Sequence, residues 1–284
     1  MNLRIIRKKI KSISNVKKIT RAMQLVSAVK MKKAQQEALE TQPYRSFLEK
    51  IILRSLSTVE RNYSPLLFSH TKNNKYLYIV ISSNKGLCGF FNFSIFKLIH
   101  KEIDFKKNDF IVLGKKAASF INKIGGKIIA DFSHINFNNA ISPIFTEAIN
   151  KFMFGEYEKV YLIYNHFISA TKFETIQTQI LPTTISGIKS SIINEEKKEY
   201  FIEPDPKTVV EEVLKNLVEE KIRGAVIESQ AAEHSARMLA MKNATDNAGE
   251  IIYNLTLLRN KVRQERITNE LLDMVSAKIS VESN

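Results

Sequence analysis

The sequence predicts an α/β fold with a long antiparallel coiled coil, in which two terminal helices form a shaft around a central three-layer, Rossmann-like domain. Apolar residues recur every three or four positions near the start of the chain, residues 207–284 contain no proline, and short apolar segments alternate with helical stretches between these regions. The expected boundaries are 1–60 for the N-terminal helix, 74–203 for the α/β domain and 207–284 for the C-terminal helix.

The N-terminal helix is predicted from a narrow apolar seam, typical of a helix with one partner helix. The seam consists of Leu3, Ile6, Ile10, Ile13, Val16, Ile19, Met23 and Val26. Successive steps of three residues around Ile13–Ile19 depart from a heptad, so we expect a stammer that overwinds the coiled coil locally. Pro43 lies inside the helical pattern and predicts a kink, with a complete break as the alternative.

The C-terminal helix is predicted to begin after the paired prolines of Glu203–Lys207. An i, i+4 ladder of small side chains, which would let a second helix approach closely, comprises Ala232, Ala236, Ala240, Ala244 and Ala248. At 1.5 Å per residue the two terminal helices would be roughly 80 and 115 Å long, against a radius of gyration near 14 Å for the middle domain. They must therefore project from it and cover each other's seams.

Short apolar segments in the middle of the chain predict a largely parallel sheet with helices between most strands. The expected strands are Tyr76–Ser82, Phe110–Leu113, Lys127–Ala130, Val160–Asn165 and Phe173–Leu181. The polar stretch 183–199 is predicted to be a loop.

The formal charge of +14 is concentrated at the N-terminus, where residues 1–72 carry 16 Lys or Arg against 4 Asp or Glu. Residues 207–284 carry 11 against 12. An acidic surface is therefore expected near the N-terminal helix. Nucleic acid and an acidic protein remain near parity as that partner, although the helix lacks the regularly spaced aromatic, Asn or Gln residues of a nucleic-acid reader.

Catalytic motifs are weak. The turn Ser82–Gly89 lacks the spacing of a phosphate-binding loop. A lone cysteine such as Cys88 is more often a buried side chain than a catalytic nucleophile. His234 cannot converge with Glu233 and Ser235 on one substrate atom, because adjacent helical residues point in different directions. We expect no metal site, no cofactor, no membrane-spanning helix and no secretion signal.

The segment Glu233–Gly249 closely resembles the gamma subunit of F-type ATP synthases of the bacterial type, and the resemblance continues through Leu255–Gln264 and Ile267–Asp273. Ile5–Ser12, Lys18–Met23 and Lys85–Gly89 resemble the same family. The sequence departs from the family at Asn84, Lys85, Phe90, Ala277 and Lys278.

The resemblance implies a non-catalytic rotor shaft that couples ion flow through a membrane ring to ATP synthesis or hydrolysis. The implied partners are a hexamer of alpha and beta subunits, the epsilon subunit and the membrane c-ring, with one copy per complex at the cytoplasmic face of the bacterial membrane, no cofactor and no nucleic acid. The partner-contact residues carried over are Lys17, Lys18, Arg21, Met23, Arg237, Arg263, Gln264, Thr268 and Glu270. The alternative function is that of a basic coiled-coil nucleic-acid-binding or scaffold protein.

Overall fold

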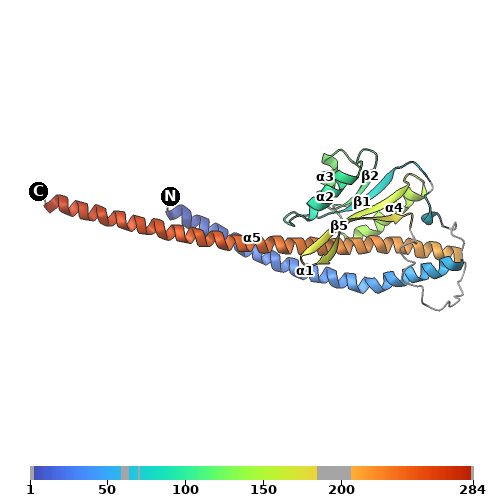
Figure 1. The fold of residues 1–284 in the computed structure, drawn as a ribbon, viewed down its shortest axis with the longest axis horizontal. Coiled ribbons are helices and arrows are strands. Elements are labelled where there is room, and N and C mark those ends of the chain that lie inside the picture. Colours follow the sequence, from blue (N-terminus) through green and yellow to red (C-terminus); the bar gives the residue numbers. More distant parts are fainter. Residues whose placement is uncertain (1–2, 59–63, 70, 184–205, 283–284) are drawn as a thin grey trace. The chain divides into compact units, whose positions relative to one another are not determined.

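A computed structural model describes residues 3–58, 64–69, 71–183 and 206–282. Along the chain the elements are α1 (Leu3–Thr58), η1 (Pro65–Leu67), β1 (Tyr76–Ile81), α2 (Phe91–Glu102), β2 (Asp109–Leu113), α3 (Lys115–Lys123), β3 (Lys127–Asp131), η2 (Asn138–Ala140), α4 (Ile141–Met153), β4 (Lys159–Ser169), β5 (Lys172–Leu181) and α5 (Pro206–Glu282) (Figure 1). The chain divides into two compact units. Unit 1 comprises Met1–Ser27 with Met238–Asn284, and unit 2 comprises Ala28–Arg237.

The sheet of unit 2 has five strands in the order β3-β2-β1-β4-β5. The strands β1 to β4 are parallel, with Ile79 opposite Ile111 on one side and Leu162 on the other, and β5 joins β4 in the antiparallel direction. All five predicted strands are confirmed, with boundaries shifted by up to four residues. Of the predicted loop 183–199, only Thr183 lies within the described residues.

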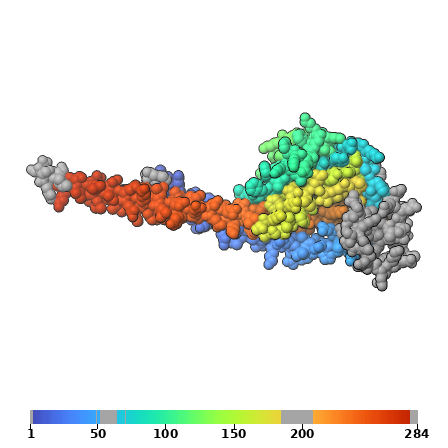
Figure 2. All heavy atoms as spheres, viewed as in Figure 1, coloured from blue at the N-terminus to red at the C-terminus, as the bar shows by residue number. Residues whose placement is uncertain are grey.

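The sheet is covered on both faces, which confirms the predicted three layers. Alternate residues of β1 point to opposite faces. Leu77, Ile79 and Ile81 belong to one apolar cluster with α4 and the first turns of α5, whereas Tyr78 and Val80 belong to a second cluster with α2 and α3. Figure 2 shows the green and yellow segments of unit 2 packed together.

Both long helices are confirmed as single elements. The helix α1 passes through Pro43 and continues to Thr58, so the alternative of a complete break at this proline is wrong. The helix α5 extends from Pro206 to Glu282. Its backbone contains no proline beyond the first residue, which is the position where a missing N–H costs least.

The predicted stammer in α1 is wrong. Positions seven residues apart are buried or half-buried throughout the helix: Ile6, Ile13, Thr20, Ser27, Ala34, Thr41 and Leu48. The repeat is therefore a regular heptad, typical of a helix with one packed seam. Three residues assigned to the predicted seam, Val16, Ile19 and Val26, are instead 49–60% exposed. The prediction followed apolar residues, whereas the seam continues through polar ones.

Contacts within each unit show that the two long helices run antiparallel. In unit 1, Thr20 lies opposite Thr245, and Lys17, earlier in α1, lies against Gly249, later in α5. In unit 2, Lys30 is near enough to Glu233 for its charge to act on that carboxyl, and Arg45, later in α1, approaches Gly224, earlier in α5. Two residues of the alanine ladder pack against the α/β layer. Ala232 and Ala236 pack into the apolar cluster with α2 and α3, so at these two positions the small side chains let the α/β layer approach α5. The approach of a second helix along the rest of the ladder stays a prediction.

Candidate partner interface

A pair of buried threonines links the two helices of unit 1. Thr20 is 9% exposed and Thr245 is 6% exposed, and their hydroxyl oxygens lie 2.8 Å apart. The Thr245 hydroxyl donates to the Met241 carbonyl, and the Thr20 hydroxyl also lies 3.1 Å from the Lys17 carbonyl. Both polar groups are thus satisfied away from water, as burial requires.

About one helical turn from the threonine pair, the Lys17 side chain crosses α5 at Gly249. The Lys17 ammonium nitrogen lies 3.0 Å from the point where a Cβ on Gly249 would stand. A larger side chain at this position would displace the ammonium group. The lysine side chain therefore follows the surface of α5, while Lys18 and Arg21 are exposed on α1.

Many apolar side chains of unit 1 are at least one third exposed, beyond the seam that joins the helices. They are Ile5, Val16, Ile19, Leu25 and Val26 on α1, and Ile251, Tyr253, Leu257, Leu258, Ile267, Leu271, Leu272, Met274 and Val275 on α5. Exposed apolar surface of this extent is typical of a protein interaction site. On α1 these residues alternate with Lys18 and Arg21, which gives an apolar surface with basic borders.

The partner-contact residues predicted from the resemblance have different environments. Met23 is half-buried, and Arg21 donates to Gln24. The four predicted residues near the end of α5 are all exposed: Arg263, Gln264, Thr268 and Glu270. Glu270 pairs with Arg266 at 2.7 Å, one helical turn away. These side chains are accessible to a partner, and their contacts remain a prediction.

Arg237 differs from the others because its guanidinium is occupied inside unit 2. It is 8% exposed and pairs with Glu233 at 2.7 Å. It also donates to the carbonyl oxygens of Lys85 and Gly86, which immediately precede Leu87, a residue with a φ of 62°. Arg237 thus holds a strained turn against α5, and its contact with a partner subunit stays a prediction.

The sequence candidates for catalysis are also placed by the structure. Cys88 is buried, as predicted. Burial, and then the charges of Arg237 and Lys30, lower the pKa of His234 to about 4, so its ring is neutral near pH 7. In the part of the chain that the structure describes, no group of three or more His, Cys, Asp or Glu could hold a metal ion, and no helix is long and apolar enough to cross a membrane.

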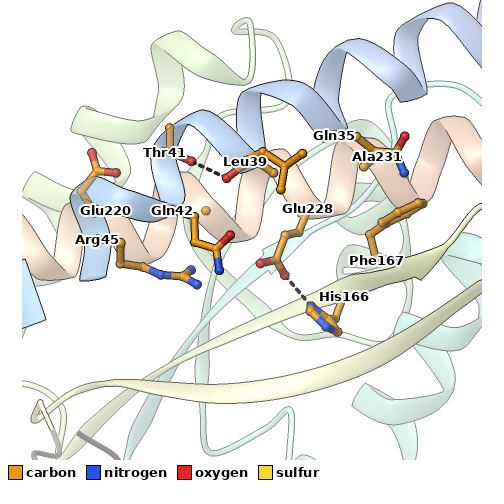
Figure 3. A pocket seen from close by; sticks show the side chains of 12 residues that line it. Gln35, Leu39, Thr41, Gln42, Arg45, His166, Phe167, Glu220, Glu228 and Ala231 are labelled. Atoms are coloured by element: carbon orange, nitrogen blue, oxygen red, sulfur yellow. Dashed lines mark hydrogen bonds and ion pairs between the residues drawn. The ribbon is translucent and has the colours of Figure 1, made fainter. Parts of the chain in front are cut away.

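A cavity of about 480 Å³ lies in unit 2 among α1, α5 and β4 (Figure 3). Its lining includes Leu39 and Phe167, together with a pair of polar side chains in which the His166 Nδ1 lies 2.6 Å from a Glu228 carboxylate oxygen. Periodicity could not reveal this pair, because its members are 62 residues apart.

Comparisons with known proteins agree over nearly the whole chain. The family model described as ATP synthase matches residues 2–281. An ATP synthase gamma chain of Variovorax paradoxus is 35% identical over 95% of this chain and 95% of its own, and one of Psychrobacter is 35% identical over 99% of each. Among solved structures, the central stalk and c-ring of the Tetrahymena thermophila mitochondrial ATP synthase includes a similar chain at 25% identity, with a TM-score of 0.57, covering 80% of this chain and 99% of that one. A chain of the Euglena gracilis enzyme has a TM-score of 0.67 at 19% identity, covering 99% of this chain and 95% of that one, and shows the same fold.

Proposed function

Because the chain belongs to the ATP synthase family and matches gamma chains along its whole length, we propose that it is the central rotor shaft of a bacterial F-type ATP synthase. In this role it couples ion flow through a membrane ring to ATP synthesis or hydrolysis. The chemistry takes place in alpha and beta subunits, and this chain is a non-catalytic component of the complex.

One observation supports this role most directly: the exposed apolar residues on both helices of unit 1. Val16, Ile19 and Val26 do not occupy the seven-residue positions of the seam. They are therefore exposed instead of packed between the two helices. A ring of partner subunits around these helices would bury them. Basic residues bordering the same surface, including Lys18 and Arg21, suit acidic loops of such subunits.

The charge difference between the helices supplies the asymmetry that a shaft needs. Residues 1–72 are strongly basic, whereas residues 207–284 are nearly neutral. A shaft with two chemically different sides touches each surrounding subunit differently at any one angle. Unequal contacts then shift the conformational equilibrium of each nucleotide site by unequal amounts. Rotation would pass each site through the same series of states.

We further propose that unit 2 associates with the c-ring and the epsilon subunit, at the cytoplasmic face of the bacterial membrane, in one copy per complex. The similar chain of Tetrahymena thermophila belongs to a structure of the central stalk and c-ring of a mitochondrial ATP synthase. The five-stranded domain lies outside the paired helices of unit 1 and would leave them for the contacts with alpha and beta subunits.

Charge reversal on α1 tests the proposed contact with acidic loops. The double variant Lys18→Glu/Arg21→Glu in a reconstituted complex should reduce ATP-driven rotation severalfold, whereas single alanine variants should be nearly silent because exposed ion pairs contribute little each. Lys32→Glu/Lys33→Glu, two exposed lysines farther along α1 in unit 2, is the matched control. Unchanged rotation in the first double variant would remove the acidic-loop contact from the proposal.

The alternative function, a basic nucleic-acid-binding coiled coil, is not favoured by the relatives. It makes a distinct prediction: salt-dependent binding of DNA by the chain without alpha and beta subunits.

A further inference from the structure

The sheet of unit 2 has a row of lysines at one edge. Because β1 to β4 are parallel, their amino ends lie at the same edge. Lys75 directly precedes β1, Lys127 and Lys159 are the first residues of β3 and β4, and Lys106 and Lys107 lie in the turn that leads to β2. We call these five residues the lysine edge. Neighbouring strands are about 4.8 Å apart, so these side chains form a row along the sheet.

Part of the lysine edge is neutralised within the chain. The carboxylate of Asp109, 4% exposed, lies 2.8 Å from the Lys75 ammonium and 3.8 Å from that of Lys127, and accepts a hydrogen bond from Tyr157. These contacts give two of the lysines a structural role.

The remaining lysines have no such role. Among the described residues, Lys106, Lys107 and Lys159 form no ion pair, and the first two are exposed. Of the nearby carboxylates, Glu156 pairs with Lys151, whereas Asp104 and Glu158 accept the backbone N–H groups of Lys106 and Asn74 and keep their negative charge. Together with Asp109, three carboxylates therefore oppose the five lysines of the edge. Positive charge is therefore left at the solvent side of this edge.

An exposed aromatic residue lies beside these lysines. Phe154, 82% exposed, and Met153, 40% exposed, are at the end of α4, in the turn that leads to β4. The Asn73 side chain donates to the Glu156 carbonyl, which ties this turn to the segment entering β1. The Phe154 ring thus projects from the same edge as the lysines.

We propose that the lysine edge, together with Phe154, binds the anionic headgroups of a phospholipid bilayer. Residues 62–222 contain no arginine, so the positive charge of this edge comes from lysine, a mobile point charge, and not from arginine, whose fork favours fixed bidentate contacts. A row of lysines next to a projecting aromatic ring is typical of contact with an anionic membrane surface. Contact of this kind does not depend on direction, so it would persist while a subunit turns. The inference goes beyond the proposed function, which assigns unit 2 to contacts with the c-ring and the epsilon subunit and none with lipid.

Single-tryptophan variants can locate such contact, because the chain contains no tryptophan. Phe154→Trp places the probe beside the lysine edge. Phe90→Trp is the matched control, because Phe90 is 76% exposed and follows the carboxyl end of β1. With vesicles of phosphatidylcholine and phosphatidylglycerol, emission at position 154 should shift to the blue and be quenched by brominated lipid, and position 90 should show neither change. Local probes are needed because the basic N-terminal segment can also attract vesicles.

Charge reversal completes the test. In the Phe154→Trp background, Lys106→Glu/Lys107→Glu should weaken vesicle binding measured at that probe at least about tenfold, since each lysine near an anionic surface contributes roughly fivefold. Lys115→Glu/Lys116→Glu, at the opposite edge, should leave it unchanged.

Four results would overturn the proposal. Two concern the vesicle experiment: equal fluorescence changes at both probes, or equal binding to vesicles of phosphatidylcholine alone. The others are an unaffected signal in Lys106→Glu/Lys107→Glu, and a fluorescence response to inorganic phosphate or a single-stranded oligonucleotide with no response to vesicles. None of these results bears on whether the chain assembles with alpha and beta subunits, which copurification measures separately.

Discussion

Thr20 of α1 and Thr245 of α5 share a hydrogen bond of 2.8 Å inside the packed seam of unit 1. The seam is unusual in having hydroxyl groups where a coiled coil ordinarily has apolar residues. A buried polar pair contributes modestly to stability and strongly penalises any register in which its members separate. We therefore interpret this pair as the feature that fixes how the two helices align.

Valine substitutions test this interpretation. Thr20→Val should lower the free energy of unfolding by about 0.5–1.5 kcal/mol, because it removes the interhelical bond, and Thr245→Val should do the same. The double variant should be less destabilised than the sum of the two, since no hydroxyl is then left without its partner. Urea unfolding of all four chains measures the coupling. Strict additivity would show that the two hydroxyls act independently.

The buried pair of Glu233 and Arg237 leads to a larger expected effect. Arg237→Leu leaves the Glu233 carboxylate without its partner and removes two donors from the Ser82–Gly89 turn. Breaking a buried ion pair in this way costs about 3–5 kcal/mol. Thermal unfolding should therefore occur at a markedly lower temperature. Arg223→Leu, which removes partly exposed pairs with Glu219 and Glu220, is the control and should cost about 1 kcal/mol or less. Similar losses in the two variants would contradict the structural role of Arg237.

The lowered pKa of the half-buried His234 leads us to expect a loss of stability in acid. Its folded pKa of about 4 lies below the ordinary value of 6.5, chiefly because of burial. Above pH 6.5 the ring is neutral in both states and contributes no pH dependence. As the pH falls from 6.5 to 4, the unfolded chain gains a proton that the folded chain does not, so stability decreases.

The variant His234→Gln should flatten this part of the pH profile, measured as the urea midpoint at half-unit steps. His134→Gln, at an exposed position, is the control for loss of an imidazole elsewhere in unit 2. Burial of Glu233 raises its pKa, which acts in the opposite sense: that group favours folding as the pH falls. An unchanged slope in His234→Gln would exclude this histidine as its cause.

Much of the fold could be predicted because strong local patterns coincide with it. The apolar strands, the proline-free C-terminal helix and the paired prolines before it depend on local sequence alone. The predicted seam of α1 was correct at Leu3, Ile6, Ile10, Ile13 and Met23 and wrong at Val16, Ile19 and Val26, because the prediction considered apolar residues alone. A seven-residue repeat that starts at Ile6 and ignores polarity identifies Thr20, Ser27 and Ala34 as seam positions.

Other features depend on residues far apart in the chain. Arg237 appears on a helix as one more basic residue, and its burial arises only when the Ser82–Gly89 turn folds against it. Likewise, the lysines at or just before the starts of four separate strands form a row only because parallel pairing brings those starts to one edge of the sheet. Tertiary contact, not local preference, decides both features.

The central claim is tested most directly by purifying the affinity-tagged, full-length chain from its own cells and identifying what elutes with it. Our account predicts an assembly that contains alpha and beta subunits in equal amounts, with one copy of this chain for every three of each, and with ATPase activity. Recovery of the chain alone, or with nucleic acid and without those subunits, would contradict it.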